Sequence, residues 1–232
     1  MSLTRLSIII PLGPEEDQLA PLLADLAQLP AATEIILVAC EGQEPEVGDK
    51  PVRWLRSEQG RALQQNVGAK AATGAFLWFL HADSRVTPEA LAALERSLKV
   101  APEALHYFHL KFKGDGPRAM GLNEAGAWFR SEILGVPFGD QGFCLGKDIF
   151  ARIGGFNETA AFGEDHLLVW QARQAGVKLR CVGASLPTSA RKYSIHGWGA
   201  LTLKYQLLWL RQAAPELVKL LRLRLRLTGQ RR

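Results

Sequence analysis

The sequence predicts an α/β fold in which a mainly parallel sheet is flanked by helices and followed by a basic helical extension. The first two-thirds of the chain alternate short apolar runs of β type with segments of helical periodicity. The composition is that of an ordinary globular protein, since 47% of the 232 residues are hydrophobic and 22% are charged. A chain of this length can bury a core without disulfides or a structural metal. We therefore expect one domain at residues 1–199 and a helical tail at residues 200–232.

Apolar runs and helical patterns alternate through the first half of the chain. The runs that predict strands are Leu6–Ile10, Glu34–Val38, Val52–Leu55 and Ala75–Leu80. The patterns that predict helices are Glu15–Gln28, Ala62–Ala72 and Pro88–Lys99. The last helix has the clearest start, because Thr87 is a good N-cap, Pro88 fits the first helical position and Glu89 favours the positive end of the helix dipole.

The second half of the chain continues the arrangement with fewer strands. In order, we expect the strand Leu105–Phe112, a helix near Arg118–Leu134, a loop at Gly135–Gly142, a short helix from Lys147, the helix Asp165–Ala175 and the strand Lys178–Val182. There is no internal repeat and no low-complexity linker. The pattern therefore favours a single sheet rather than two domains.

The cysteines and the N-terminal segment indicate a reducing compartment. Cys40, Cys144 and Cys181 are an odd number without CxxC spacing, which argues against a disulfide framework or a structural zinc site. The start, MSLTRLSIII, has no apolar region of signal-peptide length. No uncharged apolar run approaches the roughly 18 residues of a membrane span. We expect a cytoplasmic protein.

Positive charge is concentrated at the C-terminus. The net charge is +5, yet residues 1–190 carry a net charge of −4, because ten of the basic residues and only one acid follow residue 190. A nucleic-acid-binding domain usually spreads its basic residues over one face of the fold. We therefore expect no nucleic-acid partner, and an anionic partner for the tail.

Two segments of the tail combine leucine with basic residues. Ala200–Ala213 has helical periodicity, and beyond Pro215 the segment Leu220–Leu227 alternates leucine with arginine, as a helix or a strand. An anionic membrane surface satisfies both residue types, which predicts salt-sensitive binding of the tail to anionic vesicles at the inner face of a membrane. The alternative is that the apolar residues pack against the domain core.

The ends of the strands are the first place to look for a ligand site, because open α/β sheets bind ligands beyond the carboxyl ends of their strands. These segments are Pro11–Glu15, Ala39–Gly42 and His81–Ser84. None contains the GxGxxG of a dinucleotide site, and Gly142–Lys147 is one residue too short for a P-loop. The sequence therefore disfavours a dinucleotide oxidoreductase and a P-loop nucleotide hydrolase.

Asp83 is the first candidate for chemistry. It follows the apolar run that ends at Leu80, and a carboxylate at a strand end suits Mg²⁺ or Mn²⁺, which prefer oxygen ligands. The alternative is a turn or capping aspartate, although Thr87 already caps the next helix. His81 is a weaker candidate, because a polar residue at a strand end is more often structural than a ligand.

Glu164 and Asp165 form a second candidate site, because they open a helical pattern after Gly163. Acids in a first helical turn are favoured by the helix dipole, which is reason enough for their presence. The functional interpretation is that one of the two carboxylates acts as a general base.

Polar groups suited to sugars or phosphates occur in three other places. These are the turn Gly139–Gly142, the helix start with Arg61 and Asn66, and the basic cluster of Arg191, Lys192 and His196. The turn offers a carboxylate and an amide for sugar hydroxyls, or is a plain turn. The helix start favours anions. The basic cluster either binds phosphate or is a solvated surface patch.

In their order and spacing, these positions resemble the family 2 glycosyltransferases of the GT-A fold, in particular a short bacterial subgroup with chains of about this length. The matching segments are Ser7–Pro11, Gly60-Arg61-Ala62, Gln65-Asn66, Gly68-Ala69, Phe79–Asp83, Pro137–Gln141, Gly154-Gly155-Phe156, Glu164-Asp165 and Thr188–Tyr193. The resemblance implies a Rossmann-like GT-A sheet. It also implies metal-dependent transfer of a sugar, with inversion, from a nucleotide diphosphate sugar to a hydroxyl acceptor. Binding of the tail to a membrane is consistent with a lipid-linked acceptor.

The resemblance also assigns roles to individual residues. Donor binding falls to Pro11, Glu15, Glu41, Arg61, Asn66, His81 and Arg191, the sugar and acceptor site to Gly139, Asp140, Gln141 and Glu164, the divalent metal (Mg or Mn) to Asp83 with His196, and the catalytic base to Asp165. Two positions depart from the family pattern, because Ala39 replaces an aspartate, for which Glu41 can substitute, and Pro14 replaces an asparagine. These departures leave one alternative, a catalytically inactive nucleotide- or glycan-binding protein on a GT-A scaffold.

Overall fold

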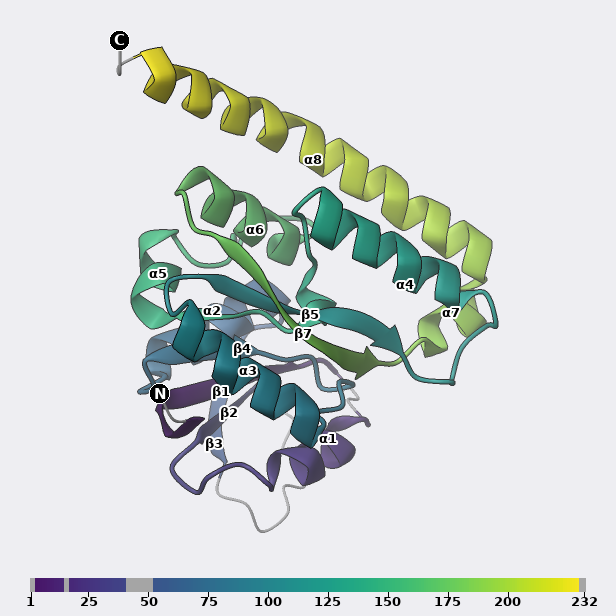
Figure 1. Ribbon diagram of the computed structural model, residues 1–232. Coiled ribbons are helices and arrows are strands. Elements are labelled where there is room, and N and C mark those ends of the chain that lie inside the picture. Colours follow the sequence, from purple (N-terminus) through teal and green to yellow (C-terminus); the bar gives the residue numbers. More distant parts are fainter. Residues whose placement is uncertain (1–2, 15–16, 41–51, 230–232) are drawn as a thin grey trace.

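The computed structural model of the protein describes residues 3–14, 17–40 and 52–229 (Figure 1). The strands are β1 (Leu6–Leu12), β2 (Glu34–Cys40), β3 (Arg53–Ser57), β4 (Phe76–Phe79), β5 (Leu105–Phe112), β6 (Cys144–Gly146) and β7 (Leu179–Thr188). The α-helices are α1 (Leu19–Leu26), α2 (Arg61–Ala71), α3 (Pro88–Val100), α4 (Met120–Trp128), α5 (Lys147–Arg152), α6 (Glu164–Gln174), α7 (Arg191–His196) and α8 (Trp198–Gly229). Shorter helical turns are η1 (Leu3–Arg5), η2 (Phe129–Ile133) and η3 (Gly139–Gln141).

The seven strands form one sheet in the order β3-β2-β1-β4-β6-β5-β7. β1 pairs in parallel with β2 and β4, β2 with β3, and β5 with β7, whereas β6 runs antiparallel to both of its neighbours. The predicted fold class, a mainly parallel sheet flanked by helices, is confirmed. The carboxyl ends of β1, β2 and β4 meet at one edge of the sheet, where an open α/β fold binds its ligand.

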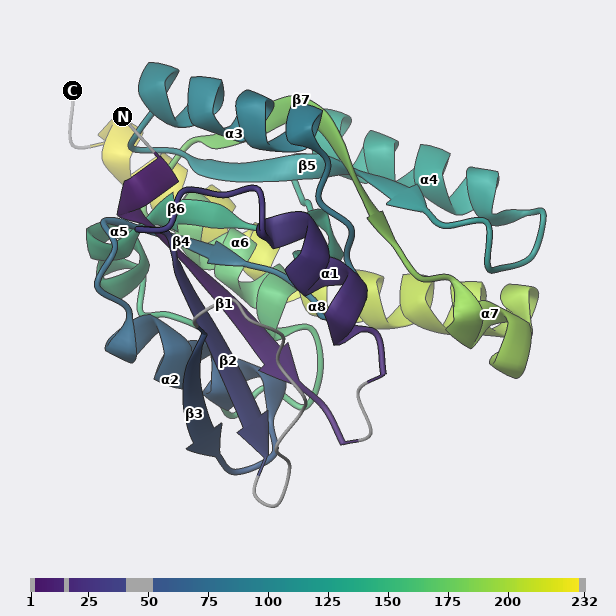
Figure 2. The same ribbon diagram turned by 90° about the horizontal axis from the view of Figure 1, so that it is seen from below.

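Both faces of the sheet are covered, so the central strands are apolar on both sides. Ile8 and Ile10 pack into one core with α1 and α3, which lie in front of the sheet in Figure 2. Ile9 points the other way, into a second core with α2, α5 and α6. This alternation follows from the two-residue period of a strand. It explains why the N-terminal run is apolar at every position.

Several predicted boundaries needed correction. The strand expected to end at Val182 continues to Thr188, and the helix expected up to Leu134 changes at Phe129 into the π-helical turn η2. The strand β6 was missed because three residues are too few to show a period. The N-terminal part of the predicted helix Glu15–Gln28 lies outside the described residues, and the described part is helical from Leu19.

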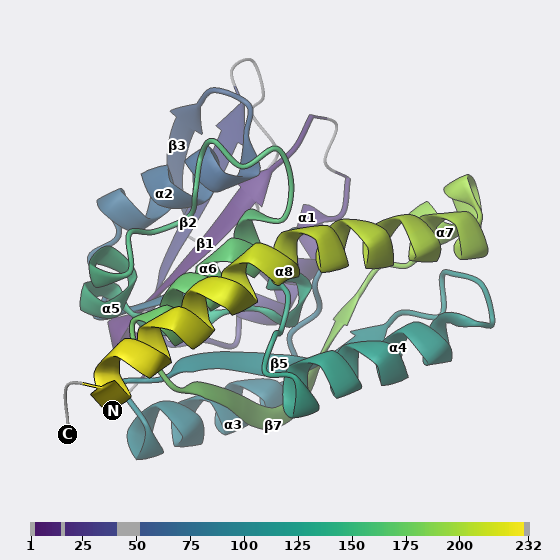
Figure 3. The ribbon, with the colours of Figure 1, turned by 90° about the horizontal axis from the view of Figure 1, so that it is seen from above.

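The C-terminal tail is one long helix, α8, which runs across α6 from α7 (Figure 3). Pro215 lies inside it, so the segment beyond this proline is helical rather than a strand. On one side α8 packs on the domain, burying Leu201 and Leu220, and Gln212 accepts a hydrogen bond from Nδ1 of His166 in α6 at 2.7 Å. The tail is therefore joined to the domain at the edge where the site lies.

No helix in the described part of the chain is both long and apolar enough to cross a membrane.

Candidate active site

A cavity of about 1050 Å³ opens at the carboxyl edge of the sheet. Its walls come from the end of β4, the starts of α2 and α6, one side of α4, the segment 158–163, and residues of α7 and α8. The sequence-predicted residues that line it are Arg61, His81, Asp83, Asp140, Glu164 and Asp165. The chain thus brings together six polar residues that lie up to about a hundred positions apart in the sequence. A large cavity with converging polar groups is the usual form of a small-molecule site.

Asp165 is held by backbone amides at the start of α6. Its Oδ2 accepts a hydrogen bond from the Gly139 amide at 2.5 Å, and its Oδ1 accepts one from the His166 amide at 2.8 Å. Burial acts to raise the pKa of Asp165, but the Arg61 guanidinium and these two amides outweigh it and lower the pKa below its ordinary value. The carboxylate therefore stays ionised at neutral pH while it faces the cavity.

Arg61 and Glu164 form an ion pair at the mouth of the cavity. The Nε of Arg61, in the first turn of α2, donates to Oε1 of Glu164, in the first turn of α6. The carboxylate is nearly buried, whereas the guanidinium side chain is about half exposed, at 46%. Arg61 thus faces solvent on one side and two carboxylates on the other, so it can also contact an anion that enters the cavity.

Asp83 and His81 lie beyond the end of β4. The hydroxyl of Thr188, at the end of β7, donates to Oδ1 of Asp83 at 3.0 Å and so fixes the orientation of the carboxylate. Burial, reinforced by the Arg61 charge, lowers the pKa of His81 to about 4, although Asp83 and Asp165 act in the opposite direction. His81 is therefore a neutral imidazole at pH 7 and can accept or donate a hydrogen bond.

Asp140 has an unused acceptor in the cavity wall. Its Oδ1 is buried and has no hydrogen-bond partner among the described residues. The indole Nε1 of Trp209 in α8 is also buried and also lacks a partner among these residues. Burial raises the pKa of Asp140, while the charges of Arg130 and Lys192 oppose the rise. Leaving a buried polar atom unpaired costs about 1–3 kcal/mol, so both groups favour a bound molecule that hydrogen-bonds to them.

The turn Gly139–Gln141 supports the site from behind, since only Asp140 of its three residues lines the cavity. A Cβ at Gly139 would lie 2.9 Å from Oδ2 of Asp165, so glycine is required for the carboxylate to approach the backbone this closely. The side chain of Gln141 is buried and is used within the protein, because it accepts from Ser131 Oγ at 2.9 Å and donates to the Phe108 carbonyl at 2.8 Å. Gln141 is not among the described residues that line the cavity, and its predicted contact with a sugar stays a prediction.

Two of the predicted donor-binding residues, Pro11 and Asn66, lie away from the cavity. Pro11 is buried inside β1, opposite Val38. The side chain of Asn66 joins α2 to the segment that contains Phe156. Its amide nitrogen donates to the Phe156 carbonyl at 2.8 Å, and its Oδ1 accepts a hydrogen bond from the Phe156 amide. Neither residue is among the described residues that line the cavity, and their predicted donor contacts stay predictions.

Of the predicted basic cluster, Lys192 lines the cavity, whereas Arg191 and His196 lie elsewhere. Arg191 forms an exposed, two-pronged ion pair with Asp17, at 3.0 and 3.2 Å. His196 ends α7 on the surface, and neither residue is among the described residues that line the cavity. Among the residues that the structure describes, no group of three metal-ligating side chains contains His196 or Asp83. Glu15 and Glu41 lie outside the described residues.

Several lining residues had not been expected at the site. Arg130 comes from the π-helical turn η2, where it lies over the Phe138 ring with Cζ 3.4 Å from the ring centre. Tyr205 and Trp209 come from α8, which the sequence had assigned to a separate tail. In the sequence, the only indication that Arg130 has a role is its position within the apolar stretch that ends the predicted helix. The change from α to π geometry at this point has no sequence pattern of its own.

Comparison with known proteins identifies the relationship. The sequence model described as Glycosyl transferase family 2 matches residues 7–157. Similar solved structures include S. aureus TarS, with a TM-score of 0.63 at 18% identity over 82% of this chain and 37% of that chain. Another is GalNAc-T7 with UDP, GalNAc and Mn²⁺, with a TM-score of 0.61 at 15% identity over 79% of this chain and 43% of that chain. A third is S. aureus TarS 1-349 in complex with UDP-GlcNAc, with a TM-score of 0.62 at 18% identity over 82% and 58% of the two chains.

The sheet and its helices thus have the GT-A fold of these solved structures. Because the family match covers more than half of the chain, the protein belongs to glycosyl transferase family 2. The chain spans less than two-thirds of the length of each of these solved chains. No curated protein sequence matches it significantly.

Proposed function

We propose that the protein transfers a sugar from a nucleotide diphosphate sugar to a hydroxyl acceptor, with inversion at the anomeric carbon. The observation that carries the proposal is the ionised carboxylate of Asp165, held by two backbone amides and exposed to a cavity that also holds Arg61, His81 and Asp83. Similar solved proteins carry UDP or a UDP sugar. An inactive nucleotide- or glycan-binding protein would not need an ionised carboxylate that faces the cavity. This carboxylate therefore favours sugar transfer over binding alone.

The donor side of the cavity is the end of β4. Asp83 supplies an oriented carboxylate oxygen, and among the described residues it belongs to no group of three metal-ligating side chains. Mg²⁺ and Mn²⁺ are often held by one or two carboxylates together with substrate phosphates, so this donor set fits such an ion. When bound, the ion would neutralise the charge that develops on the leaving phosphate. Arg61 is placed to contact the same diphosphate.

The chemical step then requires one proton transfer. Asp165 accepts the proton of the acceptor hydroxyl while the hydroxyl oxygen bonds to the anomeric carbon, and the bond from that carbon to the diphosphate oxygen breaks. The attack comes from the face opposite the diphosphate, which inverts the anomeric configuration. Asp140 and Trp209 offer the unpaired acceptor and donor that sugar hydroxyls would fill.

Transfer is tested by the release of nucleoside diphosphate. The protein is incubated with Mn²⁺ and a panel of UDP, GDP and dTDP sugars, with soluble alcohols or lipid-linked hydroxyl acceptors, and the anomeric configuration of any product is determined by NMR. We expect release with at least one donor and an inverted product. A product of retained configuration would contradict the role given to Asp165.

The acceptor side proposed here lies between α4 and α8, where apolar and polar side chains both line the cavity. Its wall includes Leu122 of α4 and Leu208 of α8. Outside the cavity, α8 presents exposed leucines three, four or seven residues apart, which places them along one side of the helix: Leu203, Leu207, Leu210, Leu217, Leu221 and Leu225. Exposed basic side chains of α8, among them Arg222 and Arg226, lie next to this stripe in sequence. We propose that this face of α8 lies on an anionic membrane surface and presents the cavity to a lipid-linked acceptor.

Reversing charges on α8 is expected to release the protein from membranes. Two basic residues near a membrane surface contribute about 1 kcal/mol each, so the variant R222E/R226E should bind anionic vesicles at least about 30-fold more weakly than the wild type. The matched control R96E/K99E makes the same charge change on α3, on the opposite face of the sheet, and should bind as the wild type does. Sedimentation with anionic and neutral vesicles at low and high salt measures the binding. Wild-type protein that stays in the supernatant at low salt would rule out the membrane proposal.

A further inference from the structure

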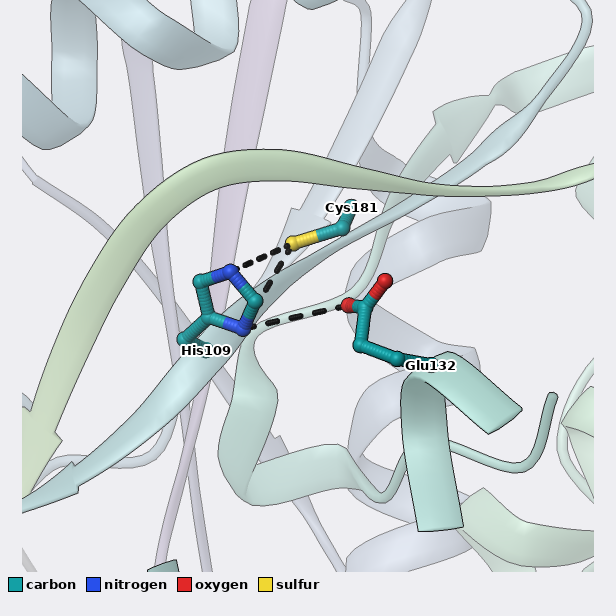
Figure 4. A group of neighbouring side chains, drawn as sticks. All are labelled: His109, Glu132 and Cys181. Atoms are coloured by element: carbon teal, nitrogen blue, oxygen red, sulfur yellow. Dashed lines mark hydrogen bonds and ion pairs between the residues drawn. The ribbon is translucent and has the colours of Figure 1, made fainter. Parts of the chain in front are cut away.

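Three side chains that can bind metals meet beside η2 (Figure 4). They are His109 of β5, Glu132 of η2 and Cys181 of β7, and their ligand atoms all lie within 4.8 Å of one another. The Cys181 sulfur lies 3.4 Å from Nε2 and 3.8 Å from Nδ1 of His109, and Nδ1 lies 3.8 Å from Oε1 of Glu132. None of the three lines the cavity described above.

Irregularities in three elements bring these residues together. Along β5 and β7 the register is interrupted, since Tyr107 pairs with Cys181 but His109 pairs with Ser185. Gly183, with φ of +79°, lies in the extra length of β7 and brings its amide to 3.5 Å from the Cys181 sulfur. The π-helical turn η2 then presents Glu132 to the same point. π-helical turns and β-bulges occur often at functional sites, where they redirect a side chain.

We propose that His109, Glu132 and Cys181 form a binding site for a divalent transition-metal ion of the zinc type. One thiolate, one imidazole and one carboxylate are ligands that Zn²⁺ accepts, usually with a fourth, open position for water. Tetrahedral geometry with bonds of about 2.0–2.3 Å separates sulfur and nitrogen ligands by about 3.5 Å. The distances from Nδ1 to the sulfur and to the carboxylate oxygen are both 3.8 Å, and the sulfur lies within 4.8 Å of the carboxylate, so the three side chains need to move closer together to bind one ion.

The surroundings of the cluster agree with this use. The phenol of Tyr107 donates to Oε1 of Glu132 at 3.1 Å, which is the kind of outer hydrogen bond that orients a ligating carboxylate. The side chains of His109 and Glu132 are 33% and 28% exposed, so an ion and its water can enter from solvent. The thiol of Cys181 would lose its proton to solvent when it binds the ion.

The cluster differs in chemistry from the proposed Asp83 site. A thiolate and an imidazole favour zinc-type ions, whereas a carboxylate with phosphate oxygens favours Mg²⁺ or Mn²⁺. An ion at the cluster would fasten η2 to β5 and β7. From the same turn, Arg130 faces the cavity and Ser131 donates to Gln141, so the ion would steady one wall of the active site from behind.

Cobalt titration tests the site, because a thiolate bound to Co²⁺ gives a charge-transfer band in the near ultraviolet. We expect this band when one equivalent of Co²⁺ is added to metal-free protein, with loss of the band on addition of Zn²⁺. Cys181→Ser should abolish the band, and His109→Gln and Glu132→Gln should weaken Co²⁺ binding. Cys40→Ser changes a comparably half-buried thiol elsewhere and should leave the band intact.

Thermal unfolding provides the second readout. Zn²⁺ should raise the Tm of the wild type and of Cys40→Ser but not that of Cys181→Ser, and metal-free Cys181→Ser should melt cooperatively near the wild-type temperature. A wild type without the charge-transfer band, or a band that persists in Cys181→Ser, would overturn the proposal, because any bound ion would then lie elsewhere. Neither readout involves donor binding, so the result is independent of the proposed transferase activity.

Discussion

Replacing Asp165 by Asn is expected to lower kcat for sugar transfer by a factor of about 10²–10⁴, which is the usual contribution of a general base. The amide keeps the shape of the side chain but cannot accept the proton of the acceptor. Donor binding should change little, because the donor contacts proposed here come from Arg61 and Asp83. The measurement is a steady-state rate with saturating donor, together with a separate binding titration of the donor.

The structure makes the controls for this variant specific. An asparagine offers one acceptor oxygen, whereas Asp165 accepts from the amides of both Gly139 and His166, so a modest loss of Tm is expected as well. Glu164→Gln changes the neighbouring acid and should retain the base, with its effect mainly on KM through Arg61. If Asp165→Asn transfers sugar at the wild-type rate, Asp165 serves only to order the start of α6.

Replacing Arg61 by Met is expected to reduce kcat/KM for the donor by about 100-fold. Hydrogen bonds to charged groups contribute about 1.5–3 kcal/mol, and Arg61 is placed to contact both Glu164 and an incoming diphosphate. Arg61→Lys should recover part of the loss, because it restores the charge without the planar fork. Equal donor kinetics for wild type and Arg61→Met would remove Arg61 from the donor site.

The same variant should change the pH dependence of transfer. In the wild type the lowered pKa of Asp165 keeps the base ionised, so activity is present at neutral pH and is lost only as the pH falls through that lowered value. Without Arg61, the effect of burial on Asp165 is less opposed, and its pKa rises. The acidic limb of the kcat profile should therefore move to higher pH in Arg61→Met. If the acidic limb of the kcat profile lies at the same pH in the wild type and in Arg61→Met, Arg61 does not lower the pKa of Asp165.

Much of the fold could be predicted because its signals are local. Apolar runs such as Leu6–Ile10 mark strands buried on both faces, and the cap formed by Thr87, which accepts from the Ala90 amide, marks the start of α3 at the predicted residue. What could not be predicted depends on distant contacts. β6 is a strand because Cys144–Gly146 fits between β4 and β5, and α8 remains helical through Pro215 while the domain holds Leu220.

The same distinction applies to the site. Asp83, Asp140 and Asp165 could be predicted as site residues because the sequence marks their positions. Asp83 follows a strand, Asp140 lies in a turn and Asp165 lies in the first turn of a helix. Arg191 and Asn66 could not be placed, since an ion pair with Asp17 and hydrogen bonds to Phe156 depend on how remote segments pack. The cluster at Cys181 was equally hidden, because its ligands come from three separate elements and have no spacing motif.

The central claim is that the cavity at the end of β4 binds a nucleotide diphosphate with a divalent ion. Calorimetric titration of UDP, GDP and dTDP, in Mn²⁺ and in EDTA, tests this without knowledge of the acceptor. We expect that at least one nucleotide binds the wild type in Mn²⁺, that binding weakens sharply in EDTA, and that Asp83→Asn removes the difference between the two conditions. No binding of any nucleotide in Mn²⁺, or equal binding by the wild type in Mn²⁺ and in EDTA, would contradict it.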